Sequence, residues 1–87
     1  MGSKTYEGVR FSVYSNDHAP PHVHGICSGV SVIIDIFSDG TVRLSKRRKA
    51  IVPATAKRNI EAKIRRVALA NADALLMLWE EMHGKVD

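Results

Sequence analysis

Three of the chain's four histidines fall within one short segment, which reads Asp17-His18-Ala19-Pro20-Pro21-His22-Val23-His24. Imidazole titrates near neutral pH and is the commonest metal ligand in proteins. A group of histidines beside an aspartate can therefore hold a metal ion, or it can act as a general acid and a general base. Because the two prolines fix φ, we expect them to hold Asp17 and His18 beside the strand that follows. This segment is the strongest candidate for a functional site.

The alternation of the strand that carries these histidines indicates which way they point. Side chains at positions i and i+2 of a strand lie on the same face, about 6.6 Å apart. Because Val23 belongs to the apolar set that must face the core, we expect His22 and His24 on the opposite, helix-free face. The same alternation puts further polar side chains on that face, namely Arg10, Ser12, Tyr14, Ser31, Asp35, Arg43 and Ser45.

The first half of the sequence indicates strands. Apolar residues recur at every second position, as is typical of half-buried strands, in residues 9–14, 30–36 and 41–45, and residues 22–27 suit a further short strand. Residues 16–21 are rich in turn formers, and Ser38-Asp39-Gly40 supplies hairpin-turn chemistry. Cys27 falls on the core side of this pattern, so we expect a small buried residue and not a nucleophile.

The second half indicates two helices. Pro53 followed by Thr55 predicts a helix start with Thr55 as the N-cap. The sequence Asn71-Ala72-Asp73 predicts a break between the helices. Gly84 predicts the end of the second helix, and His83 would place a positive charge at its C-terminus. Two apolar stripes at helical spacing lie on either side of the break: Ile60, Ile64, Val67 and Ala68, then Leu75, Leu78, Trp79 and Met82.

These elements predict an α+β fold, in which a small antiparallel sheet of three to four strands packs on one face against two C-terminal helices. The 87 residues are expected to form a single domain, residues 1–87, with residues 1–5 flexible. The single cysteine excludes an intrachain disulfide, and no apolar run is long enough to span a bilayer. We therefore expect a cytoplasmic protein, and an open sheet edge would allow it to dimerise.

Positive charge is concentrated in one part of the sequence. Of the 13 Lys and Arg residues, ten lie between Arg43 and Arg66, where Glu61 is the only acidic residue. This imbalance favours a polyanionic partner, either RNA or an acidic protein segment, although solvated surfaces carry such charges for solubility alone. The candidate nucleic-acid-binding residues are Arg10, Arg43, Lys46, Arg47, Arg48, Lys49, Lys57 and Arg58.

The histidine segment leaves three interpretations open. In the first, His18, His22 and His24 bind a divalent metal such as zinc, with Asp17 as a further ligand or as a partner that orients one. In the second, His22 and His24 act without metal on RNA as general base and general acid, assisted by His18 and Asp17. In the third, the polar face is a non-catalytic protein-binding module. An enzyme would be either ribonuclease-like or a metal-dependent hydrolase.

Two stretches of the sequence resemble one protein family. Phe11-Ser12-Val13-Tyr14 followed by Asp17-His18-x-Pro20-Pro21-His22-x-His24 looks like the start of a bacterial family of small proteins, the domain of unknown function 4160. The ending Leu75-Leu76-x-Leu78-Trp79-Glu80 is similar to the closing helix of that family, whereas residues 46–60 are more basic than the family segment.

The resemblance implies no established activity. It does imply a place beside a second small domain, in gene pairs that look like toxin–antitoxin modules. Together with the charge pattern, it leads us to expect the toxin-like member of such a pair, which engages RNA through the face that carries histidine and arginine.

Overall fold

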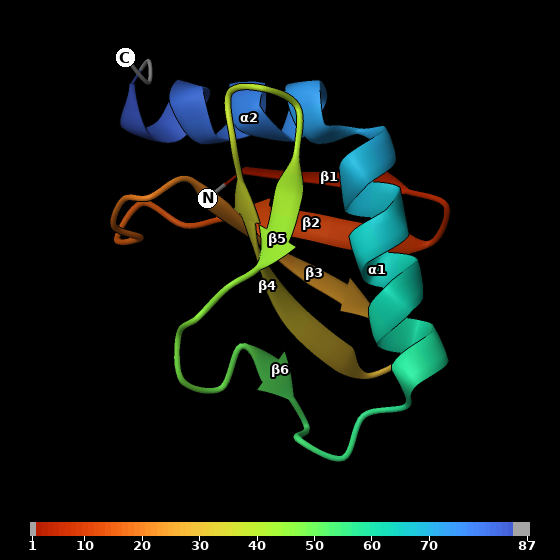
Figure 1. Ribbon diagram of the computed structural model, residues 1–87. Coiled ribbons are helices and arrows are strands. Elements are labelled where there is room, and N and C mark those ends of the chain that lie inside the picture. The colour runs from red at the N-terminus through yellow and green to blue at the C-terminus, as the bar shows by residue number, and fades with distance from the viewer. Residues whose placement is uncertain (1, 85–87) are drawn as a thin grey trace.

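The computed structural model describes residues 2–84 (Figure 1). Within this range the chain forms six strands followed by two helices. The strands are β1 (Gly2–Tyr6), β2 (Val9–Val13), β3 (His22–Cys27), β4 (Val30–Ile36), β5 (Val42–Leu44) and β6 (Ile51–Val52). The helices are α1 (Arg58–Ala70) and α2 (Ala72–His83). In the part of the chain described here, no helix is both long and apolar enough to cross a membrane.

The strands form one antiparallel sheet in the order β1-β2-β3-β4-β5, and β6 also pairs with β4. The predicted α+β class is confirmed, but the sheet is larger than the predicted three to four strands. The two extra strands lack an alternating apolar pattern: β1 has three exposed residues at its centre and β6 has only two residues. Residues 2–5, for which the sequence predicts flexibility, pair with β2 as part of β1.

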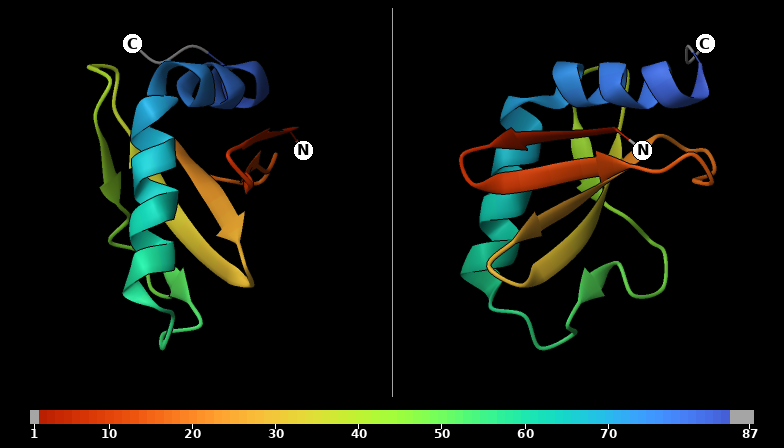
Figure 2. Two further views of the ribbon diagram at one scale, coloured as in Figure 1. Left: turned by 90° about the vertical axis from the view of Figure 1, so that its right-hand side faces the viewer. Right: turned by 180° about the vertical axis from the view of Figure 1, so that it is seen from behind.

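The two helices pack on the sheet and enclose one apolar core (Figures 1 and 2). Helix α1 lies against β3, β4 and β5, whereas α2 lies against β1, β2, β3 and β4. Each large apolar side chain buried in this way contributes about 1.5–3 kcal/mol to folding. Most of the predicted inward residues are buried, and Ile60 and Met82 of the helical stripes are partly buried. The buried ones include Val9, Phe11, Val13, Val23, Cys27, Val32, Ile34, Ile64, Val67 and Leu75.

The start of α1 differs from the prediction. Thr55 is not an N-cap, because it lies in a turn in which the Ala56 N–H donates to the Pro53 carbonyl. The helix begins at Arg58, and Lys57 precedes it in an extended conformation without a side-chain cap. Proline at the start of this segment therefore marks a turn and not the first turn of the helix.

The break between the helices is confirmed. The Asn71 side-chain Nδ2 donates to the Val67 carbonyl near the end of α1, and α2 begins at the next residue. Gly84 ends α2 as predicted, with a φ of 90° that favours glycine. The break turns the chain so that α2 covers the sheet end that α1 leaves open (Figure 2).

Gly25 permits the close approach of α1 to β3. A Cβ atom at this position would lie 2.6 Å from Cγ2 of Ile64 and 3.0 Å from Cε1 of Phe11. Both neighbours are fully buried, so neither has free space into which to move. The absence of a side chain here brings the helix close to the strand that carries the histidines.

We predict that Gly25→Ala lowers the free energy of unfolding by about 1–3 kcal/mol, because the added methyl overpacks the core. Urea denaturation measures the change. Ser3→Ala on the exposed face of β1 is the control and should stay within about 0.5 kcal/mol of the parent protein. Equal stability of the Gly25→Ala protein would contradict the close contact between α1 and β3.

Candidate metal centre

The two strand histidines share one face of β3, as predicted. Val23 between them is fully buried in the core. The cross-strand partner of His22 is Asp35 and that of His24 is Ser12, so these polar side chains lie on the same face. The ring centroids of the two histidines are 5.3 Å apart. Alternation along β3 therefore brings together the two imidazoles that the sequence singles out.

The prediction that this face is free of helix is wrong around His22. His22 is only 3% exposed, Ser12 2% and Asp35 6%. The loop of residues 14–21 places Asp17 against the two imidazoles, and the Trp79 ring of α2 lies 5.1 Å from the His22 ring. The alternation rule gives the face of each side chain, but it does not report which loop or helix end lies over that face.

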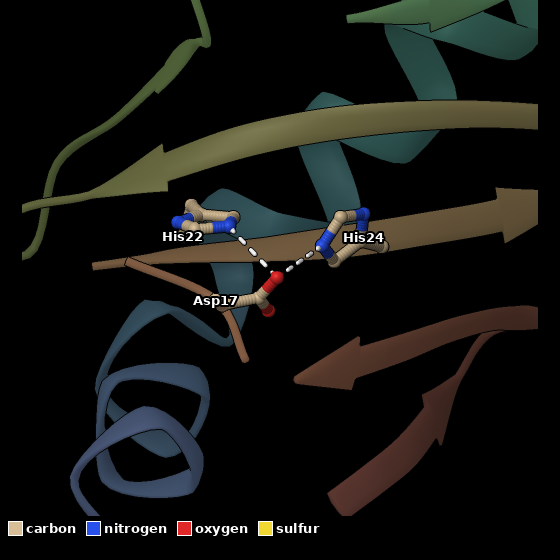
Figure 3. A group of neighbouring side chains, drawn as sticks. All are labelled: Asp17, His22 and His24. Atoms are coloured by element: carbon tan, nitrogen blue, oxygen red, sulfur yellow. Dashed lines mark hydrogen bonds and ion pairs between the residues drawn. The ribbon is translucent and has the colours of Figure 1, made fainter. Parts of the chain in front are cut away.

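Asp17 is held in place by the turn that follows β2. The Asp17 N–H donates to the Tyr14 carbonyl at 3.0 Å, and the Tyr14 N–H donates to Asp17 Oδ2 at 2.9 Å. The other carboxylate oxygen, Oδ1, lies 3.3 Å from Nε2 of His24 and 3.5 Å from Nε2 of His22 (Figure 3). Oδ1 thus faces two imidazole nitrogens, while the hydrogen bond that Oδ2 accepts from Tyr14 orients the carboxylate.

The His22 ring is fixed by the loop itself. Its Nδ1–H donates to the Pro20 carbonyl at 2.9 Å, since a carbonyl oxygen can only accept a hydrogen bond. Neutral His22 then carries a lone pair on Nε2, and this lone pair points towards Asp17 Oδ1. Two hydrogen-bond acceptors oppose each other here, an arrangement that a cation or a proton between them would stabilise.

The charge states of the two residues follow from their surroundings. Burial lowers the pKa of His22, and the nearby Arg47 charge adds to this, while the Pro20 hydrogen bond and Asp17 oppose it. Burial alone would raise the pKa of Asp17, but the hydrogen bonds from Tyr14 and His24 outweigh it and lower the value. At neutral pH the site therefore combines a carboxylate with a neutral His22, which is the state that binds a metal ion.

The distances also suit a metal ion. Ligand atoms of Asp17, His22 and His24 all lie within 4.8 Å of one another. In a tetrahedral site with bonds of about 2.0–2.1 Å, two ligand atoms lie about 3.4 Å apart. The contacts of 3.3 and 3.5 Å match that separation. The shorter one is a hydrogen bond from His24 Nε2–H to Asp17 in the metal-free site, so a metal ion would replace that proton.

His18 is not part of this group. Among the described residues, the set that can hold a metal contains Asp17, His22 and His24. His18 is exposed, and its backbone carbonyl accepts a hydrogen bond from Arg47 Nη2 at 3.1 Å. The three-histidine set expected from the sequence is thus replaced by two histidines and a carboxylate, because the turn at Tyr14 aims Asp17 and not His18 at β3.

The end of α2 supports the site, a contribution that sequence reasoning missed. The His83 Nε2–H donates to the Tyr14 carbonyl at 3.0 Å, and the His83 ring stacks on Trp79 with centroids 4.0 Å apart. Trp79 in turn contacts His22. In the sequence, only the spacing of Trp79 and His83 by one helical turn indicates that the two rings lie together. It does not identify the loop that they contact, because Tyr14 is 69 residues from His83 in the chain.

The candidate nucleic-acid-binding residues do not all face one direction. Arg47 is largely engaged within the fold, because Nη1 pairs with Asp35 at 3.3 Å and Nη2 binds the His18 carbonyl. The Arg43 guanidinium lies 5.1 Å above the Phe37 ring. Arg43, Lys46 and Arg47 line one hollow beside Pro20 and Asp35.

The other basic candidates are spread over the surface. Lys49 lines a neighbouring hollow along β5 and β6, and Arg58 lines a third one on α1 beside Glu61. Arg10 is exposed on β2, and Arg48 and Lys57 are exposed outside the strands and helices. Sequence clustering therefore overstates how many of these charges act together.

Comparison with known proteins gives one match. The domain of unknown function DUF4160 matches residues 8–80, a range that contains the whole group of Asp17, His22 and His24. Neither the comparison with curated proteins nor the comparison with solved structures gives a match.

We predict that the chelator-treated protein loses stability as the pH falls below about 6.5, the ordinary pKa of histidine. The unfolded chain binds a proton at His22 in this range, whereas burial keeps the folded protein from binding it. His22→Gln should remove up to about 1.4 kcal/mol per pH unit from this dependence. Urea denaturation between about pH 5.5 and 7.5, one unit either side of the histidine value, measures the change. Exposed His18→Gln is the control. Identical slopes in the parent and His22→Gln proteins would contradict the assigned burial of His22.

Proposed function

The chain belongs to the family of the domain of unknown function DUF4160, and we propose that it binds a divalent transition metal through Asp17, His22 and His24. One observation carries the proposal. Oδ1 of Asp17 faces Nε2 of both histidines at separations typical of neighbouring metal ligands. The Pro20 carbonyl meanwhile fixes the tautomer of His22 that leaves Nε2 free to coordinate.

The donor set limits the kind of metal. Two imidazoles and one carboxylate suit zinc or ferrous iron, whereas magnesium and calcium prefer sites made entirely of oxygen. Structural zinc sites use four protein ligands, whereas three ligands leave a position open for water or substrate. The site therefore has the donor set of a catalytic metal centre, and a metal bound there would supply an activated water molecule for hydrolysis.

A hollow of about 380 Å³ lies beside the proposed ligands and reaches one of them, Asp17. Asp17 lines it together with His18, Pro21, Trp79 and His83. The hollow lies between the loop that carries Asp17 and the end of α2, which contributes Trp79 and His83 to its lining. His18, although not a ligand of the proposed metal, borders this hollow.

Direct acid–base chemistry by His22 and His24 on RNA is a weaker proposal. A general base must contact the proton that it removes, and His22 is 3% exposed. Both rings also lie against the same carboxylate oxygen, which leaves no room for a phosphate between them. The toxin-like role that the family resemblance implies stays a prediction.

We predict that the protein purified without a histidine tag binds one equivalent of zinc or cobalt, and that His24→Ala weakens binding at least about tenfold. Isothermal titration calorimetry measures the affinity. Cobalt absorption in the visible range reports on the ligands and on a low coordination number. Asp17→Asn should weaken binding in the same way, because the amide nitrogen or neutral oxygen is a poorer ligand than the carboxylate.

His18→Ala is the matched control, since it removes an imidazole from the same loop that lies outside the proposed ligand set. It should bind metal as tightly as the parent protein. Circular dichroism verifies that each variant is folded. Less than one equivalent of metal in the parent protein, or equal losses in His18→Ala and His24→Ala, would exclude the proposed centre.

A further inference from the structure

A second hollow lies next to the candidate metal centre. It has a volume of about 420 Å³ and is lined by Pro20, Asp35, Arg43, Ser45, Lys46 and Arg47. Three of these six side chains are cationic and one is anionic. Pro20 connects the hollow to the metal centre, because its carbonyl accepts the Nδ1–H of His22.

The charge of the hollow is only partly neutralised within the fold. Arg47 pairs with Asp35, which is largely buried, and Nη1 of Arg47 also donates to Ser45 Oγ at 3.3 Å. Within residues 2–84, neither Arg43 nor Lys46 pairs with a carboxylate, and both are exposed. The Phe37 ring under Arg43 orients the guanidinium without cancelling its charge. Two exposed cations without a carboxylate partner among the described residues thus lie beside a third that pairs with Asp35.

Phosphate is the anion that this arrangement fits. Arginine binds phosphate oxygens through two parallel N–H donors, and lysine adds a point charge. No aromatic side chain lines the hollow, so it offers nothing on which a nucleobase could stack. A ligand that binds here is held through its phosphate and not through its base.

The cationic surface extends beyond a single phosphate. Ser45 and Arg47 also line the neighbouring hollow of about 670 Å³ along β5 and β6, where Lys49 adds another positive charge. The rest of that hollow is apolar, so a strand that continues past the first hollow would keep its phosphates near Arg47 and Lys49 at the edge. A mononucleotide would contact the first hollow alone. The cations along the two hollows complement a chain of phosphates, which carries one negative charge per nucleotide.

We propose that the hollow formed by Arg43, Lys46 and Arg47 beside His22 binds the phosphodiester backbone of a single-stranded nucleic acid. The binding needs no metal, so it goes beyond the proposed metal centre and can fail or succeed independently. If both sites are correct, a strand held in the hollow lies directly beside the metal ligands.

The test is fluorescence anisotropy with labelled oligouridylate and oligothymidylate of about ten nucleotides, in the presence of a chelator. Lys46→Ala should weaken binding of either strand about fivefold at low salt and reduce the slope of log K against log salt by about 0.7, the loss of one phosphate contact. Arg43→Gln should act in the same direction. Inorganic phosphate should compete only weakly, because it occupies a single position along the path.

Lys57→Ala is the matched control, because it removes the same charge from an exposed lysine that lines neither hollow. It should leave the salt slope unchanged. Equal effects of Lys46→Ala and Lys57→Ala would overturn the proposal, since they would indicate attraction by net charge alone. Competition by polyglutamate as strong as that by unlabelled oligouridylate would also overturn it and would indicate an acidic protein partner.

Discussion

One carboxylate oxygen, Oδ1 of Asp17, organises the functional end of this fold. It faces the Nε2 atoms of His22 and His24 at 3.5 and 3.3 Å, in a place where little water reaches. An ionised oxygen beside an imidazole lone pair is unfavourable unless a positive charge lies between them. The fold nevertheless holds both groups in this arrangement, with Tyr14 orienting the carboxylate and Pro20 orienting the ring. A metal ion resolves this conflict, which is why we interpret the group as a metal centre.

Three separate parts of the chain are needed to maintain this contact. Strand β3 sets the spacing of the two imidazoles, and the close packing of α1 on Gly25 fixes the position of β3. The loop of residues 14–21 supplies Asp17, and Arg47 fastens that loop through the His18 carbonyl. The end of α2 closes the site from the other side through Trp79 and His83. The site is therefore a property of the tertiary fold and not of the histidine segment alone.

The sequence predicted the parts of this site that depend on local periodicity. Alternation along β3 predicts the shared face of His22 and His24, and the two prolines before β3 predict that Asp17 and His18 lie beside the strand. It could not predict that a loop and a helix end cover this face, because such contacts join residues far apart in the chain. For the same reason the sequence places His83 only at its helix end, and it places Arg47 among the candidate nucleic-acid-binding residues without indicating the ion pair with Asp35. The extra strands β1 and β6 were missed because they carry no apolar alternation.

Nitrogen-15 NMR of the histidine side chains tests the central contact most directly, because it reports which ring nitrogen carries a proton and which one binds metal. In the metal-free protein at neutral pH we expect His22 to be protonated on Nδ1 alone. Addition of zinc should then shift the Nε2 signals of His22 and His24 and leave those of His18 unchanged. A proton on Nε2 of neutral His22, or zinc-induced shifts at His18 with none at His22 and His24, would contradict the role assigned to Asp17.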